Sequence, residues 1–343
     1  MMPDILDNST ILRALGGAAL AFLLSLYGTP VAARAAIAFG IVDVPDGALK
    51  RHRGPVPYLG GLAIYTGFLV ALGLVFEFDQ RVLGILLAGT IVVLLGLIDD
   101  FGVLGVGPKF AGQFVAAWVL VKSDIAIHIA VIPDWLSALL SVLFIVGVAN
   151  AFNIIDIMDG LEAGTAFIAS IFLLVVSVLN GQPAIAVLTA VLAGSLLGFL
   201  RYNYHPARIF MGDCGSLFLG MTLAALAMIG KYDRHNPIGY LTPLLILGVP
   251  IFDTAYVMVL RLLHGRSPFR GSPDHFALRL KAAGWSVRGT VNLAYMTGVS
   301  LGALGLWNLY LSRTQSLFLV AGAFATMILG GLALARVSNE ARS

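Results

Sequence analysis

Long apolar runs recur along the whole chain, and they restrict its possible folds more than any other feature. Two of them are "GILLAGTIVVLLGLI" (84–98) and "LLSVLFIVGV" (139–148), and such runs approach the roughly 20 residues that span a bilayer as a helix. Only 11% of residues are charged, whereas soluble domains carry about a quarter. The runs are continuous rather than alternating, which favours helices over a β-barrel. The sequence therefore predicts an all-α, polytopic membrane bundle.

Hydropathy predicts about 10–11 transmembrane helices in one domain covering residues 1–343, without an internal repeat. The single cysteine, Cys214, excludes a disulfide framework and a multi-cysteine metal site. The first residues carry acids rather than a positive n-region, so the first span is expected to be retained. The predicted helices lie near 11–33, 58–76, 82–98, 110–122, 135–152, 164–179, 183–200, 215–230, 238–262, 289–309 and 315–335.

Basic residues are distributed unequally between the two sets of alternating connections. One set holds 15 of the 21 lysines and arginines. Because positive loops stay inside, this set is expected to be cytoplasmic, with the N-terminus outside and the C-terminus inside. The same loops carry almost every polar motif, so function is expected at the cytoplasmic face. The net charge of +3 is too small to indicate nucleic acid.

The stretch "GLIDDFGVLGVGPKF" places two adjacent acids, Asp99 and Asp100, at the inner end of a span. Neighbours on a helix point about 100° apart, so the two carboxylates are not expected to share one surface ion pair. Paired acids suit a hard divalent cation or a general base. Lys109 is a candidate partner for a phosphate or a carboxylate. The alternative is plain solvation of a helix end.

The stretch "NAFNIIDIMDGLEAG" repeats polar residues at every third position, through Asn150, Asn153, Asp156 and Asp159. On an α-helix the last three share a sector of about 120°, and 3₁₀ geometry would bring them closer still. An ordered strip of oxygens beside an apolar span predicts a site rather than interfacial polarity. Glu162 falls outside the period and is interpreted as a solvated loop acid.

"FMGDCGS" places Asp213 between glycines just before a new span. The free backbone N–H groups expected at that helix start suit phosphate oxygens, and the acid suits their metal ion. Phe210 could stack on a flat base. A small-residue packing turn is the alternative.

Two loops are strongly basic. The first carries Lys50 and His52 in "LKRHRG", and the second carries His275 and Arg279 on one face of a short predicted helix. Both suit anion recognition, although setting the topology or touching lipid head groups would explain them too. Asp253, in the span before the second loop, is left open between lining a lipid channel and pairing with an arginine.

Carboxylates, a glycine turn and basic loops at one membrane face suit phosphoryl transfer between a soluble anionic donor and a membrane-held phosphate. Such chemistry relies on Mg²⁺ and cationic clamps. The motifs quoted above, with "PIFDTAYVMVLRLLHGRSPF" and "DHFALRL", resemble in order and spacing the polyprenyl-phosphate N-acetylhexosamine-1-phosphate transferase superfamily, over residues 41–281. That is the superfamily of glycosyltransferase family 4, to which the phospho-MurNAc-pentapeptide translocase is related.

The resemblance implies transfer of a sugar-1-phosphate from a UDP-sugar to undecaprenyl phosphate, which releases UMP and starts a surface glycan. It implies Mg²⁺, with Mn²⁺ as an alternative, and a bacterial inner-membrane enzyme, with a homodimer left open. It implies that Asp99, beside Asp100, activates the lipid phosphate and that Asp213 binds the metal. The other implied contacts are a nucleotide and metal pocket shaped by Asn153 and Asp156, nucleotide contacts from Phe210, Asp159 and Lys50, and diphosphate contacts from His275 and Arg279. Asp156 is also expected to act as a catalytic residue and metal ligand. Independently of the resemblance, Lys109, His52 and Asn150 are candidate substrate-binding residues.

The sequence departs from the family in its last motif. Hexosamine transferases usually carry His-x-His-His-Arg, whereas this chain has "HFALR", with Ala277 and Leu278 in place of two histidines. The triple-histidine motif of the translocase is missing too, which favours a hexosamine-type relative and leaves the sugar undetermined. Two rivals remain. A secondary transporter predicts midplane motifs and a repeat, and a binding-only homologue predicts no turnover.

Overall fold

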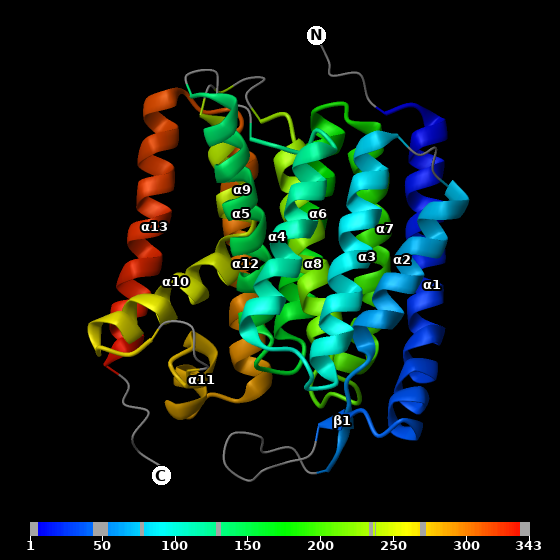
Figure 1. Ribbon diagram of the computed structural model, residues 1–343. Helices are drawn as coiled ribbons and strands as arrows, with labels where there is room; N and C mark the ends of the chain where they lie inside the picture. Colours follow the sequence, from blue (N-terminus) through cyan, green and yellow to red (C-terminus); the bar gives the residue numbers. More distant parts are fainter. Residues whose placement is uncertain are drawn as a thin grey trace.

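The computed structural model describes residues 6–43, 54–75, 79–127, 132–232, 236, 238–267 and 272–336. These residues form thirteen α-helices, one 3₁₀ turn and two very short strands (Figure 1). The predicted all-α polytopic fold is confirmed. The helices are α1 (Asn8–Ala38), α2 (Gly60–Val75), α3 (Gln80–Asp100), α4 (Val106–Lys122), α5 (Asp134–Ile155), α6 (Leu161–Leu179), α7 (Pro183–Asn203), α8 (Asp213–Ile229), α9 (Thr242–Ile246), α10 (Gly248–Leu263), α11 (Phe276–Ala282), α12 (Val287–Asn308) and α13 (Arg313–Ala335).

Fewer helices qualify as membrane spans than hydropathy predicts. Within the described residues, six are long and apolar enough to cross a membrane, and one bent pair would make a seventh. Four predicted spans do not qualify: α2, α4 and α8 have only 16 or 17 residues, and α12, with 22 residues, is long enough but not apolar enough. At 1.5 Å per residue the first three are shorter than the roughly 30 Å hydrocarbon layer.

The predicted helix near 238–262 is not continuous. It is divided into α9 and α10, which meet at an angle of 73°. Pro250, in the first turn of α10, has no N–H to donate to the carbonyl four residues earlier, and its ring crowds that carbonyl. The chain therefore turns at Leu247, and α10 lies across the bundle instead of along it (Figure 1).

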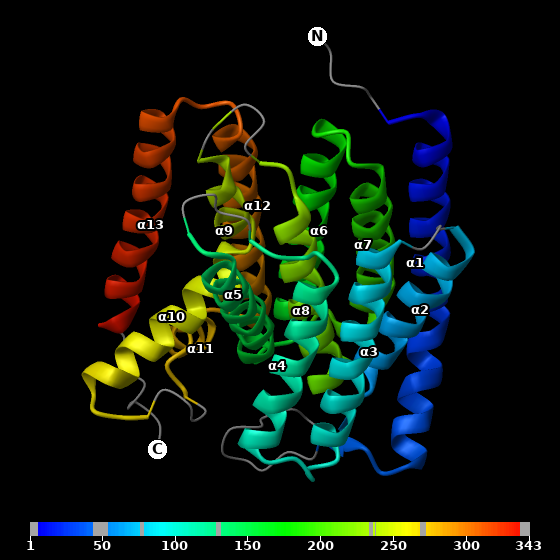
Figure 2. The same ribbon diagram turned by 45° about the horizontal axis from the view of Figure 1, so that its top comes forward.

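The polar motifs gather at one end of the bundle, which we call the motif end. There α3 and α5 end, and α4, α6 and α8 begin, at the bottom of Figure 1. A small antiparallel hairpin, β1 (Val42–Asp43) with β2 (Val56–Pro57), lies at the same end. Tilting the molecule leaves these helix ends grouped together (Figure 2). The fold thus brings segments far apart in the sequence to a single face.

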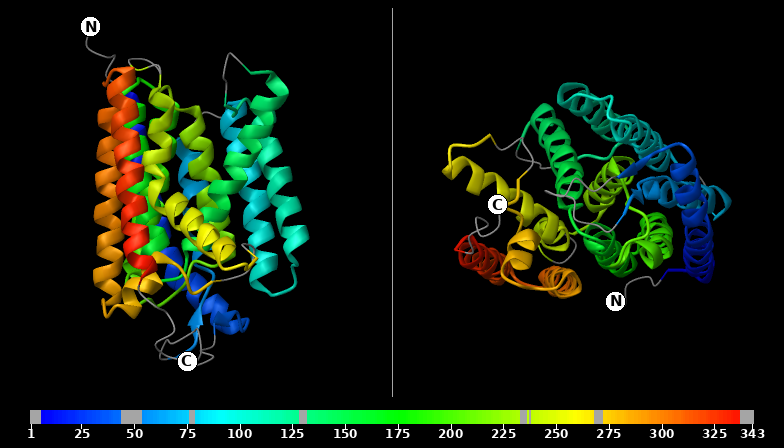
Figure 3. Two further views of the ribbon diagram at one scale, coloured as in Figure 1. Left: turned by 90° about the vertical axis from the view of Figure 1, so that its left-hand side faces the viewer. Right: turned by 90° about the horizontal axis from the view of Figure 1, so that it is seen from below.

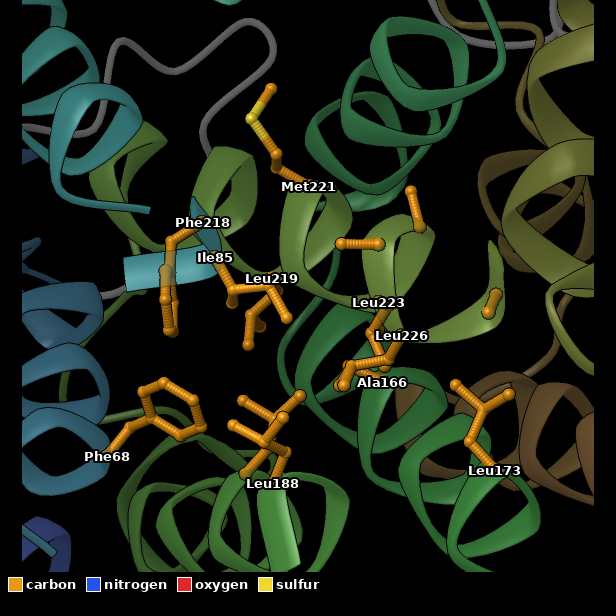
Figure 4. Close-up of a cluster of buried hydrophobic side chains, with 14 of the residues drawn as sticks. Phe68, Ile85, Ala166, Leu173, Leu188, Phe218, Leu219, Met221, Leu223 and Leu226 are labelled. Carbon is orange, nitrogen blue, oxygen red and sulfur yellow. The ribbon is translucent and has the colours of Figure 1, made fainter. Parts of the chain in front are cut away.

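Helix α8 forms the centre of the apolar core. Its residues from Cys214 to Ala227 are all buried, and it packs against α2, α3, α5 and α6. Phe218 has its ring centroid 5.3 Å from that of Tyr65 and 5.6 Å from that of Phe68, both edge to face. Leu219, Leu223 and Leu226 extend the cluster toward α6 and α7 (Figure 4). This packing fixes the start of α8, and with it Asp213.

The outer helices present apolar side chains to the surroundings. α1 and α13 stand on opposite sides of the bundle in the view from below (Figure 3). Large apolar side chains on them are mostly exposed, among them Leu12 at 73% and Phe318 at 75%. Exposed apolar surface of this extent indicates contact with lipid. The chain is a multi-pass membrane protein.

Candidate active site

Four polar side chains from four helices meet at the motif end. The Nζ atom of Lys109 on α4 lies 2.7 Å from Oδ2 of Asp99 on α3, and it also contacts Oδ2 of Asp213 on α8. Asn153 on α5 brings its Oδ1 within 3.4 Å of the same ammonium, and its Nδ2 donates to Oδ1 of Asp213 at 2.9 Å. We call these four residues the central cluster. The sequence placed them in three separate motifs, and the fold unites them.

Asp100 has a different position from its neighbour Asp99. Its Oδ1 accepts a hydrogen bond from the backbone N–H of Asp213 at 2.8 Å, and its Oδ2 accepts one from Cys214 at 3.2 Å. The expected divergence of the two carboxylates is therefore found. From the end of α3, the carboxylate of Asp100 therefore binds the first N–H groups of α8 and fixes the position of Asp213.

This arrangement corrects the prediction of free N–H groups at the start of α8. The N–H groups of Asp213 and Cys214 bind Asp100, and those of Gly215 and Ser216 donate to the carbonyl of Gly212. A carboxylate of the chain itself already occupies the anion site that the glycine motif suggested for phosphate. Asp213 remains directed at the central cluster through its side chain.

The polar strip predicted along residues 150–159 is divided among several partners. Asn150 pairs with the buried Gln113 of α4 and donates to the carbonyl of Val146. Only Asn153 joins the central cluster. Helix α5 ends at Ile155, so the geometry that would align Asn153, Asp156 and Asp159 stops before the strip is complete. The prediction of one continuous strip is wrong for this reason.

Asp156 and Asp159 follow the end of α5 and lie in different surroundings. Asp156 is partly buried and, within the described residues, its carboxylate has no hydrogen-bond partner. Burial, and the nearby charges of Asp213, Asp100 and Asp159, raise the pKa of Asp156 to about 7. Asp159 instead has Oδ2 2.7 Å from Nδ1 of His205 and accepts the N–H of Ala207 at 3.0 Å. It anchors the 204–207 loop.

Glu162 differs from the solvated loop acid that the sequence predicts. It is 1% exposed in the first turn of α6, and neither carboxylate oxygen has a partner within the described residues. The burial of Glu162 could have been predicted from helical spacing. One face of α6 carries Glu162 together with Ala166, Ala169 and Leu173, and the last three belong to the core. Figure 4 shows Ala166 and Leu173 within that core.

The first predicted basic loop is followed by a segment that contacts the glycine motif. β1 and β2 close the loop, while Lys50 and His52 lie outside the described residues. The chain then docks on the glycine motif, since Gly60 and Gly61 donate to the carbonyls of Phe210 and Met211 at 3.0 and 2.8 Å. Phe210 is therefore placed at the motif end by its backbone.

His275 and Arg279 are not brought to the central cluster by any contact within the described residues. Nδ1 of His275 lies 2.7 Å from Oδ2 of Asp253, whose Oδ1 accepts the N–H of Phe276 at 3.0 Å. Arg279 pairs with Asp274 at 2.7 Å and donates to the last carbonyls of α13, those of Leu334 and Ala335. Neither alternative for Asp253, lining a lipid channel or pairing with an arginine, is found. Its side chain is fully buried and its partner is His275. These groups fasten α11 to α10 and α13.

The donor set of the central cluster fits Mg²⁺. Within the described residues no three His, Cys, Asp or Glu side chains form a ready metal cage. Mg²⁺ does not need one, since it is usually bound by one or two carboxylates, waters and substrate phosphates. Asp99 and Asp213 direct one oxygen each at the same cation, Lys109. Asp100 and Asp156 lie close enough to Asp213 to interact with it electrostatically, so they add further carboxyl oxygens near that point.

Comparison with known proteins identifies relatives of this chain. Residues 82–231, which include Asp99, Lys109, Asn153 and Asp213, match the family model described as glycosyl transferase family 4. A probable undecaprenyl-phosphate N-acetylglucosaminyl 1-phosphate transferase of Bacillus subtilis (strain 168) is 37% identical over 294 residues, which are 81% of this chain and 81% of that protein. The chain belongs to glycosyl transferase family 4.

Two further members are more distant. The decaprenyl-phosphate N-acetylglucosaminephosphotransferase of Mycobacterium leprae (strain TN) is 34% identical over 322 residues, covering 80% of each chain. The undecaprenyl-phosphate alpha-N-acetylglucosaminyl 1-phosphate transferase of Escherichia coli (strain K12) is 25% identical over 293 residues, covering 78% of this chain and 76% of that one. The resemblance of the motifs to this superfamily is thus confirmed.

Proposed function

We propose that this family 4 chain transfers a sugar-1-phosphate from a UDP-sugar to a polyprenyl phosphate such as undecaprenyl phosphate, with release of UMP. One observation carries the proposal. Asp99, Lys109, Asn153 and Asp213 converge where apolar helices end, so a water-soluble donor and a membrane-held acceptor can meet there. The relatives' names support an N-acetylhexosamine as the sugar and a polyprenyl phosphate as the acceptor. The proposed product starts a cell-surface glycan.

We assign different tasks to the polar groups. Asp99, with its side chain 18% exposed, takes the proton of the acceptor phosphate if that phosphate arrives as its monoanion. An acceptor oxygen then forms a bond to the phosphorus next to the sugar. The bond from that phosphorus to the bridging oxygen breaks, and its electron pair leaves with UMP. Lys109 offsets the phosphate charge, while Asn153 and Asp100 orient Asp213.

A bound Mg²⁺ would supply charge neutralisation of the diphosphate, which dominates the catalysis of phosphoryl transfer. Asp213 is the proposed ligand, with Asp99 or Asp156 beside it, and Mn²⁺ suits the same oxygens. Phe210 and Asp159 are kept as proposed contacts of the nucleotide, because both lie at the motif end. His275 and Arg279 are assigned to structure instead.

The proposed location is the bacterial inner membrane, with the motif end in the cytoplasm. UDP-sugars are anionic and water-soluble, so they do not cross the apolar layer of the membrane. The site must therefore open to the compartment that contains them. The uneven distribution of basic residues supports the same orientation, with the N-terminus outside and the C-terminus inside. One chain contains the whole central cluster, so the reaction does not require a homodimer.

Release of UMP tests the proposal. Purified protein is incubated with Mg²⁺, undecaprenyl phosphate and a panel of UDP-sugars. We expect one donor to yield UMP, and we expect Asp99→Asn and Asp213→Asn to lower the rate at least about a hundredfold. The matched control is Asp124→Asn, which changes an exposed acid paired with Arg81. Absence of UMP with every donor would indicate a binding-only homologue, and gradient-driven uptake into liposomes would indicate a transporter.

A further inference from the structure

The ammonium of Lys109 lies between the two carboxylates that are best placed to hold a metal ion. It contacts Asp99 and Asp213 at once, with the Asn153 carbonyl oxygen as a third neighbour. We propose that Lys109 is a tethered counter-cation that competes with Mg²⁺ for these carboxylates, so that Mg²⁺ binds tightly only when a nucleotide phosphate draws the ammonium away. The proposal rests on the function proposed above and adds an order of binding to it.

Competition follows from the oxygens that the two cations share. Mg²⁺ requires carboxylate oxygens at about 2.0–2.1 Å in near-octahedral geometry. Oδ2 of Asp99 is already 2.7 Å from Nζ of Lys109, and Oδ2 of Asp213 is in contact with the same atom. A divalent ion on these oxygens would face an ammonium a few ångströms away in a partly buried site, where charges are weakly screened. Binding of Mg²⁺ therefore requires Lys109 to leave at least one carboxylate.

Lys109 is able to leave without moving the helices. It is in the first turn of α4, its side chain is 17% exposed, and a flexible four-carbon stem carries the charge. A phosphate of the nucleotide is a suitable destination, because it replaces the lost carboxylate contact with another anion. No other lysine or arginine within the described residues contacts Asp99 or Asp213, so among these residues Lys109 is the only cation that has to move.

Coupled binding is the measurable consequence. If the nucleotide removes a competitor of Mg²⁺, each ligand raises the affinity for the other by the same factor. Direct contact between Mg²⁺ and a phosphate would also produce coupling, but that coupling would not depend on Lys109. Removing the ammonium therefore separates the two explanations. In Lys109→Gln no ammonium competes with Mg²⁺ for the carboxylates, so the nucleotide should raise the Mg²⁺ affinity only slightly.

The experiment is a calorimetric titration of the full-length protein with MgCl₂, with and without saturating UMP. For the wild type we expect UMP to raise the Mg²⁺ affinity at least about tenfold. For Lys109→Gln we expect affinity without UMP at least about tenfold above the wild type, and an effect of UMP below about threefold. Lys122→Gln, at the other end of α4, should behave as the wild type. Lys109→Met is the second variant, and thermal unfolding confirms that each one folds.

Two results would overturn the proposal. One is an equal effect of UMP on wild type and Lys109→Gln, and the other is equal Mg²⁺ affinity of the two without UMP. The titration contains no acceptor and involves no turnover, so it is independent of the UMP-release assay. A protein that shows the coupling but releases no UMP would refute the proposed reaction alone. If UMP does not bind, the comparison without nucleotide still decides whether Lys109 competes with Mg²⁺.

Discussion

Asp99 pairs with Lys109, whereas Asp100 accepts two backbone N–H groups at the start of α8. The sequence allowed the divergence of these side chains to be predicted, because consecutive helical residues point about 100° apart. It did not allow the partner of Asp100 to be predicted, since that partner lies 113 residues away. Local geometry can be derived from the sequence, but a contact between distant segments depends on how the helices pack.

The burial of individual acidic side chains was the property of single residues that the sequence predicted least well. Glu162 and Asp156 are six positions apart in one polar motif. The first is 1% exposed in a core-facing position of α6, and the second is a partly buried cap of α5. Their environments depend on the turn at Gly160, where φ is +79° and α6 begins in a new direction. Glycine tolerates this left-handed conformation at little cost.

Asp156 gives a prediction for the pH dependence of stability in metal-free protein. Burial and neighbouring acids raise its pKa from 3.8 to about 7 in the folded state. The fold therefore binds the proton more strongly than the unfolded chain does. This contribution to stability is complete below about pH 4 and is lost as pH rises toward 7. Above pH 7 the ionised carboxylate destabilises the fold.

Asp156→Asn should remove this penalty. With EDTA present, we expect the variant to be more stable than the wild type at pH 8 by roughly 1 kcal/mol, a figure reduced because the side chain is partly exposed. At pH 4 the two proteins should unfold at nearly the same temperature. Thermal unfolding in detergent across this pH range measures the difference. A constant difference at all pH values would show that Asp156 does not titrate in this window.

Among the elements, α2 and α8 approach each other closely at the motif end. A Cβ atom added at Gly61 would lie 2.2 Å from the Cα of Gly215, so both positions require glycine. Gly61→Ala should therefore force the two helices apart and destabilise the protein by about 1–3 kcal/mol, with loss of activity as Asp213 moves. Gly73→Ala, in the same helix with open space around it, is the control and should be neutral or stabilising.

The short helix α11 was predicted from sequence, but its role was not. His275 and Arg279 do lie at one helix, where a resemblance to basic motifs suggested contact with the diphosphate. The structure turns both toward Asp253, Asp274 and the end of α13. The buried contact between His275 and Asp253 could not be predicted, because the sequence does not show that the chain turns at Leu247 and that α10 crosses the bundle.

His275→Ala distinguishes the two roles. Removing the imidazole leaves Oδ2 of the fully buried Asp253 without its ring partner, so we expect a loss of about 1–3 kcal/mol in stability. The KM for the UDP-sugar should change by less than about twofold, because the residue does not touch the donor. His264→Ala, at an exposed position at the end of α10, should leave the KM unchanged and lower the stability less than His275→Ala does, because it loses only a contact with the carbonyl of Leu260. A large rise in KM with unaltered stability would restore the diphosphate role.

At the scale of the whole molecule, the order and positions of the helices were predictable because each apolar run needs a helix of similar length. The convergence of the motifs was predictable too, since alternate connections must lie at the same end of the bundle. The exact site was not, because it depends on which helix ends are neighbours. Asn153 reaches Asp213, while Asn150, one turn earlier, meets Gln113 instead.

Orientation in the membrane is the remaining property of the whole molecule, and it has a direct test. The only native cysteine, Cys214, is fully buried, so an introduced cysteine should be the main target of a membrane-impermeant maleimide. We expect Lys122→Cys, at the end opposite the motif end, to be labelled from outside intact spheroplasts. Arg208→Cys, an exposed position at the motif end, should be labelled only after permeabilisation. The reverse pattern would place the site outside, where the excess of basic residues at the motif end would contradict the positive-inside rule.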